Sequence, residues 1–260
     1  MSRPNLSGKT AVITGGGSGI GRSIAEVFAQ QGAFVHILER NAEAAAATLS
    51  AIHRAQGQAE THSCDVTSPE GVTRTFSEIK GQSGAVDVLV NNAGIAHIGT
   101  VETTTEEDMD RVYNVNIKGI YHCLRASIPL MKEQGGGVIL NMASVAAMVG
   151  ISDRFAYSMS KGAVLTMTYS VAKDYLAHNI RCNCISPARV HTPFVDGFIS
   201  ENYPGQEEAM FEKLSQTQPI GRMGTPKEIA YLAAYLCSDE ASFITGTNYP
   251  IDGGFVTLNT

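Results

Sequence analysis

Short runs of β-branched and other apolar residues alternate with longer segments of helical periodicity along almost the whole chain. Strands separated by helices pair in parallel, because a crossover helix must bring the chain back to the edge where it started. The alternation predicts a doubly wound α/β fold, with right-handed crossovers, a seven-stranded parallel sheet and helices on both faces. The expected strands are Thr10 to Thr14, Phe34 to Leu38, Ala59 to Ser63, Val86 to Val90, Gly137 to Met142, Ile180 to Ile185 and Asn248 to Ile251.

The segments between these strands carry the expected helices. They are Gly19 to Gln31, Ala42 to Gln56, Pro69 to Gln82, Thr105 to Glu133, Ala156 to His178 and Pro226 to Leu236. No stretch rich in Pro, Ser or charge divides the 260 residues, so one domain spanning 1–260 is expected. Residues 193–222 are long for a connection and predict a substrate lid, although a peripheral helical excursion without function would look the same.

Charge and cysteine usage exclude several classes of protein. The net charge of −6 argues against a nucleic-acid partner, because phosphate binding needs a basic face. No apolar run approaches the roughly 18 residues of a membrane helix, and the N-terminus lacks an apolar signal segment, so a cytoplasmic protein is expected. The five cysteines lack metal-ligand spacing, which predicts buried, reduced thiols and no metal site.

A glycine-rich loop follows the first expected strand directly and opens into a helix, reading Thr14-Gly15-Gly16-Gly17-Ser18-Gly19-Ile20-Gly21. Glycines allow a tight turn, and they let main-chain N–H groups approach a pyrophosphate whose charge is favoured at a helix N-terminus. In this strand–loop–helix context the loop predicts a Rossmann-type dinucleotide site.

Tyr157 and Lys161 are spaced i, i+4, which places a phenol beside an ammonium on one helix face. A nearby cation favours the phenolate, so Lys161 is expected to lower the pKa of Tyr157 toward the working range of an acid/base group. Taken alone, the pair is more typical of an ordinary half-exposed helix face.

The glycine loop resembles the TGxxxGxG loop of the short-chain dehydrogenase/reductase family. The resemblance extends over nearly the whole chain, and the motifs occur in order: Asn91 to Gly94, Asn116, Ser144, Tyr157 with Lys161, and Pro187 to Thr192. Singly, each motif could be a turn, a helix cap or a buried polar group. Together they fall where open α/β sheets bind ligands, beyond the carboxyl ends of the strands.

The resemblance implies a catalytic group of four residues. Ser144 would bond the substrate oxygen, and Tyr157 would donate a proton in reduction or accept one in alcohol oxidation. Lys161 would also bond the nicotinamide ribose, and Asn116 would hold a water that connects Lys161 to solvent. The full expected set of cofactor-binding residues is Gly15, Ser18, Gly19, Ile20, Gly21, Glu39, Arg40, Asp65, Val66, Asn92, Ala93, Gly94, Tyr157, Lys161, Pro187, Val190 and Thr192.

Cofactor choice is indicated at the end of the second strand. Glu39 stands where an acid would accept hydrogen bonds from the adenosine ribose and repel the 2′-phosphate of NADP, which favours NAD. Arg40 complicates this, since it could bind that phosphate, stack on adenine or face solvent. Asp65 and Val66 match the pair that contacts adenine in the family, although they could form only a turn.

Three further residues indicate the substrate: His97, Arg154 and Arg189. Two guanidinium groups in one cleft would suit a carboxylate or phosphate, so an anionic substrate is expected. The pattern resembles the subgroup that acts on hydroxy acids and deoxy sugar acids. Alternatively, either arginine could pair with lid acids such as Asp196 or Glu201.

The leading interpretation is an NAD-dependent dehydrogenase that interconverts a secondary alcohol and a ketone, on a small hydroxy acid or keto-deoxy sugar acid. The alternative is an NADPH-dependent 3-ketoacyl or general carbonyl reductase, and a more distant one is a non-catalytic NAD-binding sensor. The resemblance also implies a homotetramer. The particular substrate, its stereochemistry and the direction of reaction do not follow from the residues.

Overall fold

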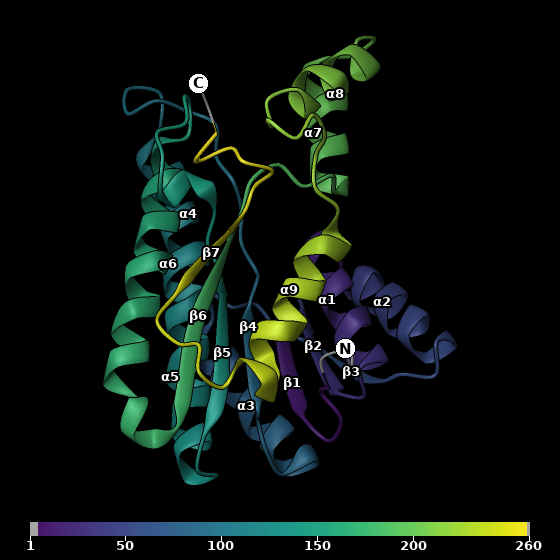
Figure 1. The fold of residues 1–260 in the computed structure, drawn as a ribbon, viewed down its shortest axis with the longest axis vertical. Coiled ribbons are helices and arrows are strands. Elements are labelled where there is room, and N and C mark those ends of the chain that lie inside the picture. The colour runs from purple at the N-terminus through teal and green to yellow at the C-terminus, as the bar shows by residue number, and fades with distance from the viewer. Residues whose placement is uncertain (1–4, 259–260) are drawn as a thin grey trace.

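One parallel sheet organises the molecule, with the strand order β3-β2-β1-β4-β5-β6-β7 (Figure 1). The computed structural model describes residues 5–258. Every neighbouring pair of strands is parallel, which confirms the predicted doubly wound α/β class. The strands are β1 Thr10–Thr14, β2 Phe34–Glu39, β3 Gln58–Ser63, β4 Val88–Asn91, β5 Gly137–Met142, β6 Ile180–Pro187 and β7 Asn248–Ile251.

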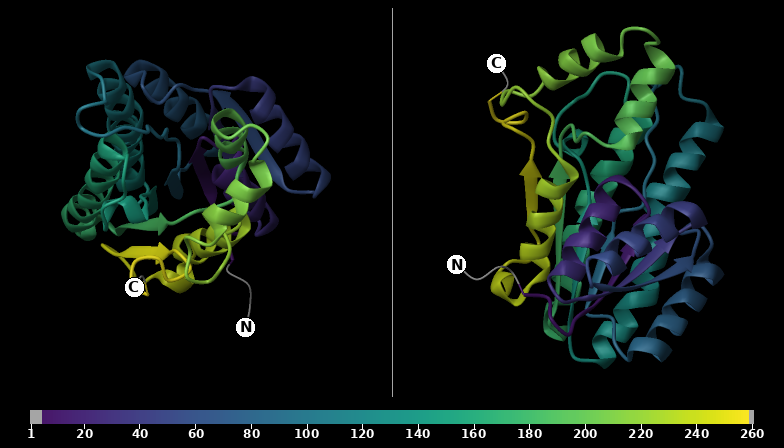
Figure 2. Two further views of the ribbon diagram at one scale, coloured as in Figure 1. Left: turned by 90° about the horizontal axis from the view of Figure 1, so that it is seen from above. Right: turned by 90° about the vertical axis from the view of Figure 1, so that its right-hand side faces the viewer.

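Helices cover both faces of this sheet (Figures 1 and 2). They are α1 Gly19–Gln30, α2 Ala42–Arg54, α3 Pro69–Ser83, α4 Glu106–Tyr113, α5 Gly119–Glu133, α6 Phe155–Asp174, α7 Pro193–Asn202, α8 Glu207–Ser215 and α9 Pro226–Cys237. One hydrophobic core joins α1 and α9 to the sheet, with Phe28 and Ala233 fully buried. The other joins α3, α5 and α6 to the opposite face, with Phe76 and Cys123 at its centre. Alternate residues of each strand enter opposite cores because successive strand side chains point to opposite faces.

The strand order reverses beside β1, which pairs with β2 on one side and β4 on the other. In an open α/β sheet, the loops that leave the strands at such a point diverge and leave a crevice at the carboxyl ends. The glycine loop after β1 and the Asn91–Gly94 segment after β4 both leave the sheet here. The topology therefore brings two of the predicted motifs to one place.

The helical stretch predicted for Thr105 to Glu133 is present, but a π-helical segment, Asn114–Lys118, which the sequence did not predict, joins α4 to α5 within it. The buried side chain of Asn116 within this segment bonds both main-chain groups of Ile95. A π segment adds one residue to the helical turn, and such segments are frequent at functional sites. Its wider turn changes the helix face on which a residue such as Asn116 lies.

Other boundaries differ from the predictions by a few residues. β4 begins at Val88 because the amide of Val86 donates to the Gln134 side chain, at 3.0 Å, rather than to a strand. α6 ends at Asp174, and a 3₁₀ turn, Leu176–His178, completes the predicted segment.

Residues 193–222 form α7 and α8, which rise beyond the carboxyl end of the sheet (Figure 2, right). Ile199 and Leu214 of these helices pack with Met223 in a small hydrophobic cluster separate from the two main cores. A cavity of about 370 Å³ lies against the pair and is lined by His191, Asp196, Ile199, Glu207, Glu208 and Phe211. The excursion thus has its own packing, and its role as a lid stays a prediction.

The cysteines that the structure describes all lie free and buried. Within residues 5–258, no helix is both long and apolar enough to cross a membrane.

Candidate active site

The glycine loop is built so that side chains are excluded from its centre. A Cβ on Gly21 would come within 2.2 Å of the Gly15 carbonyl oxygen, and Gly15 itself has a φ of 65°. Ser18 precedes α1 in an extended conformation, and within the described part of the chain its side chain makes no capping hydrogen bond. The main-chain N–H groups in the first turn of α1 are therefore available to an anion.

The segment after β4 holds this loop in place. The side-chain amide of Asn92 donates to the carbonyl oxygens of Thr14 and Gly15, each at 3.1 Å. The main-chain amides of Asn92 and Ala93 both donate to the hydroxyl of Thr14, each at 3.0 Å. Asn92 and Ala93, predicted as cofactor contacts, thus have a visible structural role, and Thr14 is a partner that the motif analysis did not single out.

Glu39 lies against the same loop from the end of β2. One carboxylate oxygen accepts from the Gly17 amide at 3.2 Å and the other accepts from the Asn41 amide at 3.0 Å. A Cβ on Gly17 would come within 2.9 Å of Glu39, so only glycine allows this approach. The negative charge is therefore fixed beside the loop.

Arg40 lies near Asp65 on the adjacent loop after β3. The pKa of Asp65 is below its usual value, chiefly because the Thr67 amide donates to its carboxylate, with a smaller effect from the charge of Arg40. Val66 is buried next to Asp65, and its carbonyl accepts from His122 at 2.8 Å. These residues gather at the β2–β3 side of the crevice.

The loop after β6 meets the glycine loop from the other side. A Cβ on Gly19 would lie 3.4 Å from a methyl group of Thr192, so residues far apart in sequence are neighbours. Val190 is held by a parallel bridge to Gly224, and Pro187 pairs with Ile251 of β7. Partly buried Ile20 packs under the loop against the first core.

The tyrosine and lysine of the catalytic group lie on α6. The Lys161 Nζ atom is 5.6 Å from the centroid of the Tyr157 ring and donates to the main-chain carbonyl of Met142 at 2.7 Å. Burial lowers the pKa of Lys161 to about 8. The ammonium thus lies beside the phenol and is anchored to the end of β5.

Burial raises the pKa of Tyr157 above its usual value, while a hydrogen bond with Ser144 and the charge of Arg154 act to lower it. Ser144 also accepts from the Ala146 amide at 3.2 Å, which orients its hydroxyl. Lys161 is not among the groups that lower the pKa here, so its expected effect on Tyr157 stays a prediction for the cofactor-bound protein. The influence of Arg154 was not foreseen from the motifs.

The Asn116 side chain connects the π-helical segment to the loop after β4 and to α6. Its Oδ1 atom accepts from the Ile95 amide at 2.8 Å, and its Nδ2 atom donates to the Ile95 carbonyl at 2.9 Å and to Ser160 at 3.0 Å. A Cβ on Gly94 would lie 3.2 Å from Asn116 Oδ1 and 3.7 Å from Lys161 Nζ, so Asn116 and Lys161 flank Gly94. The side-chain amide has both N–H groups engaged. The structure therefore shows Asn116 as a clamp on the loop after β4.

The charge of Arg154 acts on both Tyr157 and Arg189, so the two arginines lie near the same site. Burial lowers the pKa of Arg189, and the charge of Arg154 lowers it further. Arg189 donates to Thr217 at 3.0 Å, and Arg154 donates to the carbonyl of Asp153 at 2.8 Å. Within the described residues, neither guanidinium has an acidic partner, whereas Asp196 pairs with His191 at 2.8 Å.

His97 faces a different environment. Its Nδ1 atom lies 3.6 Å from Asp108 Oδ1, and its buried Nε2 atom lies 2.7 Å from the position of a Cβ on Gly99. Gly99 in turn forms a parallel bridge with Arg154. His97 therefore lies beside Gly99, and its predicted contact with substrate stays untested.

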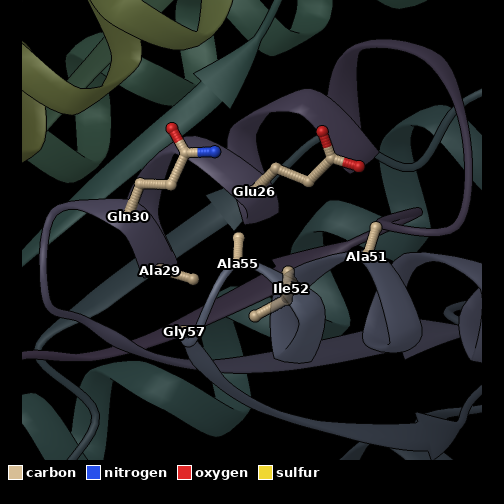
Figure 3. A pocket seen from close by; sticks show the side chains of 7 residues that line it. All are labelled: Glu26, Ala29, Gln30, Ala51, Ile52, Ala55 and Gly57. Carbon is tan, nitrogen blue, oxygen red and sulfur yellow. The ribbon is translucent and has the colours of Figure 1, made fainter.

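A small cavity of about 100 Å³ between α1 and α2 lies away from this site (Figure 3). It is lined by residues of the C-terminal halves of the two helices and by the turn before β3, which are Glu26, Ala29, Gln30, Ala51, Ile52, Ala55 and Gly57. The glycine loop lies at the other end of α1.

Comparisons with known proteins agree with this architecture. A family model described as enoyl-(acyl carrier protein) reductase matches residues 15–256. The 2-keto-3-deoxy-L-fuconate dehydrogenase of Xanthomonas campestris is 38% identical over 96% of this chain and 81% of its own length. The dehydrogenase/reductase SDR family member 6 of Aquarana catesbeiana is 39% identical over 96% of this chain and 98% of its own.

Two solved structures show the same fold with nicotinamide cofactors. A 7α-hydroxysteroid dehydrogenase complexed with NADH and 7-oxoglycochenodeoxycholic acid has a TM-score of 0.88 and 36% identity, covering 96% of this chain and 95% of that one. The L-sorbose reductase of Gluconobacter frateurii, complexed with NADPH and L-sorbose, has a TM-score of 0.94 and 28% identity, covering 99% and 100%.

The fold and the motifs define an oxidoreductase that binds a nicotinamide cofactor and acts on an alcohol or ketone. The chain belongs to the short-chain dehydrogenase/reductase family, as its motifs predicted.

Proposed function

We propose that this protein is an NAD-dependent dehydrogenase of a small hydroxy acid or keto-deoxy sugar acid, with Tyr157 as the acid/base group. The observation that carries the anionic substrate is that the charge of Arg154 lowers the pKa of Arg189, while neither guanidinium has an acidic partner among the described residues. Two like charges held close in a partly buried position destabilise each other. A carboxylate placed between them would relieve the repulsion and be bound bidentately.

The geometry fits a dinucleotide. The side-chain-free centre of the glycine loop and the first turn of α1 would hold the pyrophosphate, and Glu39 would accept from the adenosine ribose. The nicotinamide end of the cofactor would lie against Lys161, Tyr157, Val190 and Thr192. When bound, the cofactor accepts or donates the hydride. The protein itself would orient the substrate and transfer the proton.

Tyr157 holds or releases the proton of the substrate oxygen. Ser144 is hydrogen-bonded to Tyr157. Its hydroxyl would also bond the substrate oxygen and so orient that oxygen toward the phenol of Tyr157. The positive charge of Arg154 favours the phenolate form, and Lys161 would add to this effect in the cofactor-bound protein, so alcohol oxidation, in which Tyr157 accepts a proton, would become easier. Lys161, held by the Met142 carbonyl, keeps its ammonium beside the phenol during this transfer.

NAD is proposed over NADP because the Glu39 carboxylate is fixed beside the glycine loop, where it would repel a 2′-phosphate. Arg40 lies near Asp65, whose carboxylate competes with a phosphate for its charge. The relative named a 2-keto-3-deoxy-L-fuconate dehydrogenase supports the substrate class, since a keto-deoxy sugar acid carries a carboxylate.

The test is the initial rate of NAD reduction with matched pairs of hydroxy acids and uncharged alcohols, sugar acids included. Arg154→Ala and Arg189→Ala should each lower kcat/KM for the acids roughly ten- to hundredfold, the value of a hydrogen bond to a charged group. Arg54→Ala, an exposed position at the end of α2, is the matched control and should leave the rate unchanged. Equal turnover of acids and neutral alcohols would overturn the anionic substrate.

A general or 3-ketoacyl carbonyl reductase is the second candidate, and the NADPH complex of L-sorbose reductase is the observation that favours it. The same assays run with NADPH and uncharged ketones distinguish the two. Faster turnover with NADPH and neutral ketones would establish the reductase.

We also propose a homotetramer. Phe243 is fully exposed in the single chain, and Tyr121 and Tyr169 on α5 and α6 are about half exposed, at 48% and 43%. Large apolar groups on a monomer surface are typical of subunit interfaces. Light scattering after size-exclusion chromatography measures the assembly, and a monomeric mass would contradict the proposal.

A further inference from the structure

A cluster of two histidines and a glutamate lies outside the active site, at the edge of the sheet. His36 comes from β2, and Glu60 and His62 come from the neighbouring edge strand β3 (Figure 1). His36 is paired with Glu60 and Leu38 with His62 in the parallel register, so all of these side chains point to the face that α3 covers. One ligand atom from each of His36, Glu60 and His62 lies within 4.8 Å of the other two.

The histidine nitrogens lie slightly closer together than two ligands of one metal ion. His36 Nδ1 lies 2.9 Å from His62 Nε2. Two ligands on Zn²⁺, with bonds of about 2.1 Å, are separated by roughly 3.0–3.4 Å, so a small shift of the His62 ring is enough. His62 is half-buried on an edge strand and is free to make that shift.

The outer nitrogen of His36 is held in the way that metal-bound histidines usually are. His36 Nε2 lies 2.8 Å from the Ser83 hydroxyl, which can accept its N–H. That hydrogen bond leaves the Nδ1 lone pair facing His62 and sets the ring orientation. His36 is fully buried, so packing also fixes the position of its ring beside His62.

The surroundings favour a cation. Glu60 is exposed, and within the described residues its carboxylate has no hydrogen bond or ion pair, so it can turn toward the histidines. Glu60 and Glu78 both act on His62 electrostatically as negative charges. Ser83 is the last residue of α3, whose C-terminal carbonyl groups carry partial negative charge. The edge strand leaves the fourth position open to water.

We propose that His36 Nδ1, His62 Nε2 and the Glu60 carboxylate bind one Zn²⁺ per chain, with water as the fourth ligand. Two histidines, one glutamate and a water are a normal tetrahedral zinc set. On binding, the proton shared between the two rings moves to Nδ1 of His62, so both rings stay neutral. The ion would fasten the edge strand β3 to β2 and, through Ser83, to α3.

The test is equilibrium dialysis of the metal-stripped, full-length protein against Zn²⁺, with Co²⁺ absorption as a second readout. The expected result is one Zn²⁺ per chain, and visible bands of tetrahedral Co²⁺. His62→Gln and Glu60→Gln, on the edge strand, should weaken Zn²⁺ binding at least tenfold, and Ser83→Ala should weaken it by about ten- to hundredfold through the lost orientation of His36.

His178→Ala is the matched control, because this exposed histidine lies just before β6, several strands away from β2 and β3, and should leave the affinity unchanged. Far-ultraviolet circular dichroism of each variant verifies that it is folded. Failure of the wild type to take up Zn²⁺ would overturn the proposal. Equal affinity in wild type and His62→Gln would overturn it as well.

Discussion

Lys161 donates a 2.7 Å hydrogen bond from its ammonium to the main-chain carbonyl of Met142. Met142 ends β5, and Ser144 follows two residues later, so the strand that presents Ser144 also anchors Lys161. The ammonium is buried, and its pKa is lowered to about 8. The protein thus keeps a desolvated cation next to Tyr157 at a cost in stability, which is typical of a catalytic site.

Replacing Tyr157 by Phe should lower turnover about a thousandfold, the usual value of a positioned acid/base group. The ring of Phe fills the same space, so binding of NAD should stay within a factor of about two of the wild type by this volume-conserving change. Steady-state kinetics and a fluorescence titration with NADH measure the two effects. Tyr175→Phe, at the end of the same helix, is the control. Activity retained in Tyr157→Phe would remove Tyr157 from the mechanism.

Replacing Lys161 by Met should abolish turnover and stabilise the cofactor-free protein by about 1–2 kcal/mol at pH 7, because an unpaired buried charge is removed. Urea denaturation measures the free energy of unfolding. The pKa of Lys161 is about 8 when folded and near 10.5 when unfolded, so unfolding takes up a proton between these values and wild-type stability rises with pH there.

The stability gain of Lys161→Met should therefore shrink as the pH rises from 8 to 10. Lys173→Met, an exposed change in the last turn of α6, should have almost no effect. A Lys161→Met protein that is less stable than the wild type at pH 7 would contradict the inference that the buried Lys161 ammonium destabilises the folded state.

Replacing Glu39 by Gln should lower the preference for NAD over NADP by about tenfold, since about 1.4 kcal/mol of charge repulsion corresponds to that ratio. Gln keeps an oxygen that can accept from the Gly17 amide, so the loop should keep its shape. The ratio of kcat/KM for the two cofactors is the measurement. Glu43→Gln, on α2 four residues away, controls for general charge, and an unchanged ratio in Glu39→Gln would leave cofactor choice to another residue.

The stability of the metal-free protein should fall as the pH is lowered from about 6.5 to 4. The pKa of buried His36 is about 4 when folded and 6.5 when unfolded, so in this range only the unfolded chain binds the proton. The full loss is on the order of 3 kcal/mol and levels off below pH 4. Urea denaturation at pH 7.5 and 4.5, with His36→Gln alongside, measures it. A His36→Gln protein with the same pH dependence as the wild type would assign the loss to other groups.

Sequence periodicity was sufficient for the central strands, because a strand buried on both faces is a short apolar run. The predicted and observed ranges of β1, β5 and β7 coincide. It failed at Asn116, where a continuous helical pattern hides the π segment. That irregularity depends on the hydrogen bonds from Asn116 to Ile95, a partner on another loop that no local pattern reveals.

The sequence by itself determined the fold class, the family and the set of residues that meet at the crevice, because the glycine loop, Ser144, Tyr157 and Lys161 occur in fixed order after particular strands. Only the tertiary structure decided which charges face one another. Arg154 affects both Tyr157 and Arg189, Lys161 is anchored to Met142, and His36 meets His62 across two strands. The strength of an electrostatic interaction depends on the distance between the charges and on their burial. In a chain folded through parallel crossovers, residues that are neighbours in space are tens of residues apart in sequence, so a local pattern does not reveal these distances.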